Sequence, residues 1–323
     1  MTDTQHTYPL TGRVVRNTGA HYVVETAPGH EINCKVKGNF RIKGLRTTNP
    51  VAVGDMVRVG EPGPDGTAYI IDVLDRRNYI VRRSINLSKQ SHIIAANVDQ
   101  AVLVASLAHP TTSTNFIDRF LATAEAYRVH AVLCINKVDL LTEPEDRELL
   151  DAVAYLYRSI GYDVVCVSAR TGEGLDELRG LLRGKVSLFS GNSGVGKSTL
   201  VNDLIPGIEQ RTAEISAVHD QGMHTTTFSE LFHLPDDPDG CIIDTPGVRG
   251  FGTVDFDKAD VSHYFPEMFA IGRECRFGNC THVHEPGCAV RAALDEGRIA
   301  QSRYASYLSI LDDSADDKYR KPF

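Results

Sequence analysis

The stretch from Phe189 to Leu200, FSGNSGVGKSTL, constrains the fold of this chain more than any other. It contains the pattern G-x-x-x-x-G-K-S, in which a glycine-rich turn joins a strand to a helix and leaves backbone N–H groups free to cradle phosphate oxygens. An apolar run at 186–189 precedes the turn as a buried strand, and residues 199–205 follow as a helix. The pattern therefore predicts an α/β domain that binds a nucleotide.

The residue types in this loop suit phosphate chemistry. Glycines let the backbone approach the phosphates closely, Lys197 would reach the β- and γ-oxygens, and the Ser198 hydroxyl would hold Mg²⁺. On its own, the loop leaves ATP and GTP both open. The residues expected to contact the nucleotide here are Gly191, Asn192, Ser193, Gly194, Val195, Gly196, Lys197, Ser198 and Thr199.

Two short motifs upstream indicate that the base is guanine. NKVD at 136–139 follows a buried strand, and N-K-x-D reads guanine in GTP-binding proteins, because the aspartate accepts hydrogen bonds from the ring N–H and the exocyclic amine. SA at 168–169 follows the next expected strand and matches the motif whose backbone N–H contacts the guanine oxygen. Ligands of open α/β sheets bind at the carboxyl ends of strands, where both motifs lie. The expected base contacts are Asn136, Lys137, Asp139, Ser168 and Ala169.

Two elements after the phosphate loop complete the set. A polar segment at 208–224 ends in a run of threonines, and a γ-phosphate with Mg²⁺ can order such a segment, so either Thr225 or Thr226 could sense the metal. DTPG then matches the D-x-x-G arrangement, in which Asp244 holds the metal through water and the Gly247 N–H meets the γ-phosphate. The expected magnesium ligands are Ser198, Thr225, Thr226 and Asp244.

The order of these motifs is unusual. Both base-reading motifs precede the phosphate loop, whereas in Ras-like proteins they follow it. The ends of compact domains often lie close together at the surface, so a permuted connection can keep the same sheet and site. Residues 95–252 are therefore expected to form one circularly permuted P-loop GTPase domain of the α/β class.

The N-terminal region has a different pattern. From residue 10 to about 75, short alternating runs separated by Gly, Pro and Asp predict an all-β barrel of the oligonucleotide-binding (OB) type, with a hairpin at 50–59. Residues 1–90 carry a net charge of +5 in a chain that carries −8, so this module could bind RNA. A purely structural barrel stays open, because no aromatic pair marks a stacking platform. The expected RNA-binding residues are Lys35, Lys37, Arg41, Lys43 and Arg46.

The C-terminal region contains a candidate metal site. The pattern C-x₄-C-x-H-x₅-C supplies three thiolates and one imidazole, which suit a closed, tetrahedral, structural zinc site. The expected ligands are Cys275, Cys280, His282 and Cys288, and His284 could replace His282. Helices are expected over 289–311, with an apolar stripe that faces a core.

The chain is thus expected to be a multi-domain protein: an OB barrel at 1–75, a linker at 76–94, the permuted GTPase domain at 95–252 and a mostly helical zinc-binding domain at 253–323. Its polar start is not a signal peptide, and no apolar run approaches the roughly 18 residues of a membrane span. We therefore expect a cytoplasmic monomer with no membrane partner and no disulfide.

These motifs, taken in this order between a basic barrel and a cysteine-histidine module, resemble the bacterial RsgA (YjeQ/YloQ) family over nearly the whole chain. The resemblance implies a GTPase that binds the small ribosomal subunit late in its assembly, with GTP or GDP and ribosomal RNA as partners. It also implies that the barrel and the zinc domain contact the RNA.

The residue that would orient the attacking water is not the usual one. In Ras-like proteins a glutamine after D-x-x-G orients this water, but Val248 stands at that position here, and an aliphatic side chain cannot orient water. His224 beside the threonine run is the candidate replacement, as the family resemblance also suggests, although an exposed loop histidine stays open. The expected catalytic residues are His224, Lys197, Thr225 and Thr226, with slow hydrolysis that the ribosomal subunit accelerates.

Four alternatives stay open at this point. A permuted GTPase could act on the large ribosomal subunit, or the chain could be a ribosome-binding GTP/GDP sensor with little turnover. An ATP-using P-loop enzyme is disfavoured by NKVD. A non-catalytic RNA-binding scaffold fits poorly with a full set of motifs.

Overall fold

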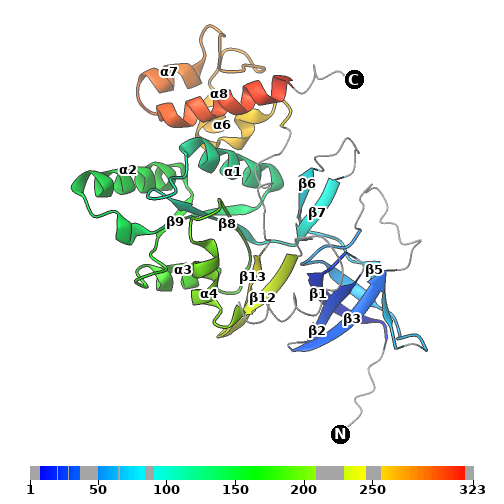
Figure 1. The fold of residues 1–323 in the computed structure, drawn as a ribbon. Helices are drawn as coiled ribbons and strands as arrows, with labels where there is room; N and C mark the ends of the chain where they lie inside the picture. The colour runs from blue at the N-terminus through cyan, green and yellow to red at the C-terminus, as the bar shows by residue number, and fades with distance from the viewer. Residues whose placement is uncertain are drawn as a thin grey trace. The chain divides into compact units, whose positions relative to one another are not determined.

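The computed structural model describes residues 8–19, 21–27, 29–36, 50–64, 66–83, 91–208, 229–244 and 256–316 (Figure 1). The chain divides into two compact units, each of which is described by itself. One contains residues 1–102, 175–190 and 197–250, and the other contains 103–174, 191–196 and 251–323.

The first unit begins with a closed five-stranded barrel. Its strands follow the order β1-β2-β3-β5-β4, and β4 pairs back to β1. Inward-facing aliphatic side chains such as Val14, Val24, Val57 and Ile70 fill the barrel, as the alternating pattern predicts. The expected OB-type barrel is confirmed. Its strands are β1 (Leu10–Asn17), β2 (Tyr22–Ala27), β3 (His30–Val36), β4 (Met56–Val59) and β5 (Ala68–Val73).

The predicted hairpin at 50–59 is wrong. Residues 51–55 form a turn instead of a strand, and β4 pairs with β1 and β5. The cause is the fully buried Asp55, whose carboxylate accepts a bond from the Ala52 N–H at 2.8 Å and from the Arg76 guanidinium at 2.6 Å. A buried carboxylate needs such partners, and their geometry folds the segment back on itself.

The segment predicted as a linker at 76–94 contains regular structure. Strands β6 (Tyr79–Arg83) and β7 (Ser91–Ala96) pair antiparallel in a separate two-stranded sheet. Asn97, which follows β7, holds the open end of this sheet. Its side chain accepts from the Arg77 N–H at 2.9 Å and donates to the Gly54 carbonyl at 3.1 Å.

The rest of the first unit combines strands with helices. β11 pairs parallel with β13, and β12 forms an antiparallel hairpin with β13. Val186, Leu188 and Ile243 are buried, as expected for strands covered on both faces. The elements are α3 (Leu175–Leu182), β11 (Val186–Gly191), α4 (Lys197–Leu204), β12 (Ser229–Leu234) and β13 (Asp237–Asp244).

The second unit alternates strands with helices, as predicted. β10 pairs parallel with β9, which neighbours β8. Helix α1 begins where the Ser113 hydroxyl accepts a bond from the Phe116 N–H, a standard N-cap. The elements are β8 (Gln100–Ser106), which belongs to this unit from Leu103 on, α1 (Thr114–Tyr127), β9 (His130–Asn136), the 3₁₀ turn η1 (Val138–Leu140), α2 (Pro144–Ile160) and β10 (Asp163–Cys166).

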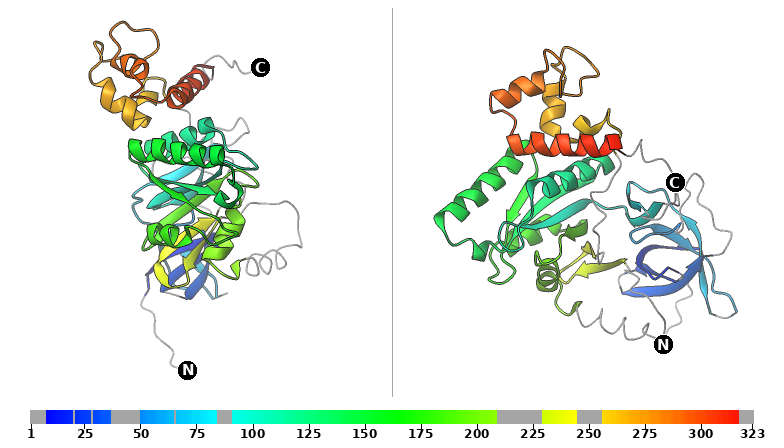
Figure 2. Two further views of the ribbon diagram at one scale, coloured as in Figure 1. Left: turned by 90° about the vertical axis from the view of Figure 1, so that its left-hand side faces the viewer. Right: turned by 45° about the horizontal axis from the view of Figure 1, so that its top comes forward.

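The C-terminal part of this unit is helical. Phe265, Met268, Val290 and Tyr307 form its core, and α8 packs along α1 (Figure 2). The helices expected over 289–311 are present as α7 and α8, with residues 296–300 between them. The elements are η2 (Val261–Tyr264), α6 (Pro266–Gly272), α7 (Ala289–Asp295) and α8 (Gln301–Asp316). In the described part of the chain, no helix is long and apolar enough to cross a membrane.

Candidate functional site

Asn136, the last residue of β9, connects the loop that contains Ala169 to the glycine-rich loop at 191–196. Its amide nitrogen donates to the Val195 carbonyl at 3.0 Å, and its amide oxygen accepts from the Ala169 N–H at 3.1 Å. The side chain is 2% exposed. One buried amide therefore holds three sequence-predicted segments, at 136, 169 and 195, in one place.

Lys137 makes a second connection to the phosphate loop. It adopts the left-handed conformation, with φ of 68°, and its Nζ donates to the carbonyls of Gly194 and His109, both at 2.7 Å. The lysine side chain thereby reaches the glycine-rich loop. The part played by His109 could not be read from the sequence, because a backbone carbonyl leaves no signal in residue type.

Asp139 lies beside Ser168. The Ser168 hydroxyl donates to the Asp139 carboxylate at 2.7 Å and accepts from the Thr171 N–H at 3.1 Å. The second carboxylate oxygen lies 3.9 Å from the exposed Arg170 guanidinium. The arrangement leaves this carboxylate able to accept further hydrogen bonds.

The glycines of the phosphate loop are required by contacts that a Cβ atom would break. At Gly191 a Cβ would lie 2.5 Å from the Val104 carbonyl oxygen, and at Gly196 it would lie 2.4 Å from the Asn136 amide nitrogen. Gly196 also has a φ of 91°. Val195 is buried, whereas Asn192 and Ser193 face solvent.

Within the first unit, Lys197 begins α4 and forms an ion pair with Asp244, the last residue of β13. Ser198 and Thr199 are exposed in the first turn of α4. Lys197 follows Gly196 directly in the chain, so the helix start and the glycine loop are covalently one element. Backbone N–H groups at a helix start, with a lysine, suit an anion, while the Asp244 carboxylate and the Ser198 hydroxyl suit Mg²⁺.

Several predicted site residues lie outside the described part of the chain. They are Gly247, His224, Thr225 and Thr226 from the nucleotide set, and Lys37, Arg41, Lys43 and Arg46 from the RNA set. Lys35 is described: it is half-buried on β3, opposite Tyr69 of β5.

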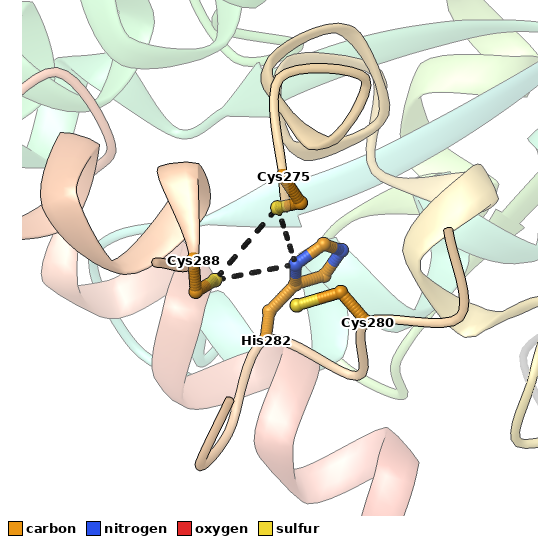
Figure 3. Close-up of side chains that lie close together, drawn as sticks. All are labelled: Cys275, Cys280, His282 and Cys288. Carbon is orange, nitrogen blue, oxygen red and sulfur yellow. Dashed lines mark hydrogen bonds between the residues drawn. The ribbon is translucent and has the colours of Figure 1, made fainter. Parts of the chain in front are cut away.

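Four residues of the C-terminal region point toward one another (Figure 3): Cys275, Cys280, His282 and Cys288. Their sulfur and nitrogen atoms all lie within 4.8 Å of one another. The Cys275 and Cys288 sulfurs are 4.0 Å apart, and His282 Nδ1 is 3.6 and 3.5 Å from them. Bond lengths of about 2.3 Å to sulfur and about 2.0 Å to nitrogen give tetrahedral edges of about 3.8 and 3.6 Å, so these three distances suit a zinc-sized ion.

Neighbouring groups favour the protonation states in which these side chains can bind a metal. The N–H groups of Ala289 and Arg291 donate to the sulfurs of Cys275 and Cys288, at 3.3 and 3.5 Å. Burial lowers the pKa of His282, which favours the neutral imidazole that binds metals. The cluster contains His282, and not His284, whose side chain is exposed.

Glu285 is a residue of this site that the motif did not indicate. Its carboxylate accepts from the Thr281 N–H and hydroxyl at 2.8 and 2.6 Å, and from the N–H groups of Val283 and His284, both at 3.1 Å. These bonds fix the turn in which His282 takes a φ of 58°. An acidic residue three positions after the histidine of the motif was the available signal.

In chain order, β9 and β10 carry the base-side motifs, and β11 then leads into the phosphate loop. This is the arrangement of a circularly permuted GTPase, here preceded by an OB-type barrel and followed by a Cys₃His module. The profile of the RsgA N-terminal domain matches residues 11–70, and that of the RsgA GTPase matches residues 73–254. The chain belongs to the RsgA family of GTPases.

The similarity to relatives and to solved structures of this family extends over nearly the whole chain. The small ribosomal subunit biogenesis GTPase RsgA of Bacteroides fragilis is 57% identical over 97% of this chain and 100% of its own, and that of Porphyromonas gingivalis is 55% identical with the same coverage. The crystal structure of YjeQ from Thermotoga maritima has a TM-score of 0.76 and 34% identity, covering 95% of this chain and 98% of its own. YloQ, a circularly permuted GTPase, has a TM-score of 0.75 and 28% identity, with full coverage of both chains.

Proposed function

We propose that this chain binds the small ribosomal subunit and hydrolyses GTP during the late maturation of that subunit. The observation that carries the nucleotide part is Asn136, which holds the base-side and phosphate loops together from a buried position. The subunit is inferred from the names of relatives that are 57% and 55% identical over their whole length.

In this proposal, Asp139 accepts the guanine N–H and amine through its carboxylate. Asn136, Lys137, Ser168 and Ala169 hold the base pocket. The amides of residues 191–197 cradle the phosphates, with Ser198 and Thr199 at the helix start and the Gly247 N–H at the γ-phosphate.

The ion pair between Lys197 and Asp244 supports a further step. Both groups are expected to bind parts of the GTP–Mg²⁺ complex. Lys197 would bind the β- and γ-phosphate oxygens, and the Asp244 carboxylate would bind Mg²⁺. Nucleotide binding would exchange these partners and separate the pair. When bound by Ser198, Asp244 and either Thr225 or Thr226, Mg²⁺ would neutralise the phosphate charge, and His224 would orient the attacking water.

The remaining modules would hold the partner. Basic residues of the barrel, with Lys35 on β3, would contact the phosphates of ribosomal RNA. The Cys₃His cluster would hold one structural Zn²⁺ that stabilises the helical domain. The proposed domains are 1–75, 76–94, 95–252 and 253–323, in a cytoplasmic monomer.

The test is GTP turnover by the purified full chain, alone and with purified small or large ribosomal subunits, and with ATP in place of GTP. We expect slow GTP turnover alone, strong acceleration by small subunits only, and no turnover of ATP. Acceleration by large subunits instead would favour the rival assignment. Full subunit-stimulated turnover in His224→Ala would remove His224 from the mechanism.

A further inference from the structure

The turn that carries Cys280 and His282 is bonded by two tyrosines of α8. The Tyr307 hydroxyl donates to the Thr281 carbonyl at 2.6 Å, and the Tyr304 hydroxyl donates to the His282 carbonyl at 2.7 Å. The two tyrosines are three positions apart on one helix, so they lie on the same face of it. One face of α8 therefore bonds two successive carbonyl groups of this turn.

These two hydrogen bonds act on both backbone dihedral angles of His282. The Thr281 carbonyl belongs to the peptide plane before the His282 Cα atom, and the His282 carbonyl belongs to the plane after it. Because each peptide unit is planar, φ and ψ alone describe how the two planes are turned relative to each other. Both planes are bonded to the same helix, so α8 sets the backbone conformation of His282.

His282 needs this support because its conformation is unfavourable. Its φ of 58° lies in the left-handed region, where the Cβ atom crowds the backbone. Such a conformation persists only where the surrounding contacts hold it in place. In this conformation, His282 Nδ1 lies 3.6 and 3.5 Å from the sulfurs of Cys275 and Cys288 (Figure 3). The backbone angles that α8 holds are therefore the angles that bring the imidazole to the cysteines.

The imidazole of His282 is also confined by packing. The ring centroid of Tyr307 lies 6.2 Å from that of His282, and Tyr307 is 1% exposed. At Gly272, the last residue of α6, a Cβ atom would lie 3.3 Å from His282 Cε1. The ring thus has neighbours on α8 and on α6, and α8 contributes both packing and hydrogen bonds.

Helix α8 is itself fixed to the α/β part of the second unit. Arg303, the neighbour of Tyr304 in the chain, donates to the Asp118 carboxylate on α1 at 2.8 Å, and both side chains are buried. The helix that positions His282 is therefore attached to α1, and the metal cluster and α1 are connected through α8.

We propose that Tyr304 and Tyr307 are positioning residues for the metal site. By holding His282 before a metal arrives, they reduce the conformational freedom that metal binding must remove, and so they raise the metal affinity. Coupling free energies are reciprocal, so a bound metal in turn strengthens the attachment of the turn to α8. The inference rests on the proposed function for the identity of the metal, and it requires neither GTP nor a ribosomal subunit.

The test is the zinc affinity of the full chain, measured by competition with a chromophoric chelator. Tyr304→Phe and Tyr307→Phe keep the ring and remove the hydroxyl, and each should weaken zinc binding by about fivefold, the effect of one hydrogen bond. Tyr264→Phe is the matched control, because Tyr264 packs against the same core and its hydroxyl bonds neither carbonyl of the described turn. Its zinc affinity should stay within about twofold of the wild type.

A merely structural role for the hydroxyls would destabilise the zinc-bound and the zinc-free chain equally and would leave the zinc affinity unchanged. Equal affinity in the wild type and both variants would therefore overturn this inference alone, whereas a wild type that binds no zinc would overturn the proposed metal as well. If Tyr307→Phe does not fold, Tyr304→Phe decides, because the Tyr304 side chain is only partly buried.

Cobalt in place of zinc gives a second readout. The visible absorption of bound Co²⁺ depends on the coordination geometry and on the number of sulfur ligands. At saturating Co²⁺ both variants should reproduce the wild-type spectrum, because all four ligands remain. Half-saturation should require about fivefold more Co²⁺ than in the wild type. A changed spectrum would mean that the hydroxyls determine which ligands bind, and it would contradict the positioning role.

Discussion

The guanidinium of Arg303 on α8 donates to the Asp118 carboxylate on α1 at 2.8 Å, and neither side chain is more than 1% exposed. Arg303 also donates to both carboxylate oxygens of Glu267 on α6, at 2.7 and 3.0 Å, and its guanidinium lies over the Phe265 ring. One arginine thus joins the helical module to the first helix of the α/β part of the second unit.

Replacing Arg303 with Met should cost about 3–5 kcal/mol, because two carboxylates lose their cation in a buried site. The measurement is chemical denaturation followed by circular dichroism. Adding Asp118→Asn should recover part of the loss by removing one of the stranded charges. Arg298→Met, from an exposed pair, should change stability by less than about 0.5 kcal/mol.

Gly196→Ala should weaken GTP binding by about tenfold or more, since its Cβ would meet the Asn136 amide and its positive φ would be strained. The affinity can be measured by titration with a fluorescent GTP analogue. Gly180→Ala is the control: it lies in α3 with open space around its Cβ position, and should leave the affinity within about twofold. Equal binding by both variants would contradict the role given to the loop.

Asp139→Asn should weaken GTP binding by about a hundredfold, because the base loses a charged acceptor. Xanthine has a carbonyl where guanine has its exocyclic amine, next to a ring N–H. The side-chain amide of the Asp139→Asn variant could donate to this carbonyl and accept from the N–H. The variant should therefore bind xanthosine triphosphate better than GTP in a competition assay. Unchanged preference for GTP would mean that Asp139 does not contact the base.

The protein should lose stability as the pH rises from about 6.5 toward 9. The hydrogen bond to Cys241 is the main cause that raises the pKa of His233 to about 9, and the bond to Glu25 adds to it. Because the pKa of His233 is higher in the folded protein than in the unfolded chain, its protonation stabilises the fold. This stabilisation is complete below the unfolded-state pKa of about 6.5 and is lost as the pH rises through the folded-state pKa. The melting temperature of wild type minus that of His233→Gln should be larger at pH 6 than at pH 9.5. A difference that grows with pH would contradict this.

The purified chain should contain about one zinc per molecule, and Cys288→Ser should reduce this to less than about 0.2. Atomic absorption gives the metal content. Cys166→Ser, a cysteine outside the cluster, is the matched control and should keep the metal. A chelator should make the helices α6 to α8 sensitive to protease in the wild type. Zinc retained by Cys288→Ser would place the metal elsewhere.

Local patterns in the sequence predicted most of the fold, because buried strands and their following loops carry strong signals. The strand before NKVD and the strand before the phosphate loop were both found this way. The pairing of β1 with β12 could not be predicted, since backbone bonds between residues 16 and 230 leave no pattern in either segment. β6 and β7 were missed because their arginines and polar neighbours resemble a linker, and the hairpin at 50–59 was mistaken because nothing in the sequence shows that Asp55 is buried.

The pairing of β1 with β12 also affects how this protein can be divided into fragments for expression. A fragment that ends at residue 75 would keep the five barrel strands but would leave Arg16 and Asn17 without the β12 backbone. Unpaired strand edges recruit other chains. Such a fragment should self-associate in proportion to its concentration, and an isolated barrel is a soluble reagent only if that edge is blocked.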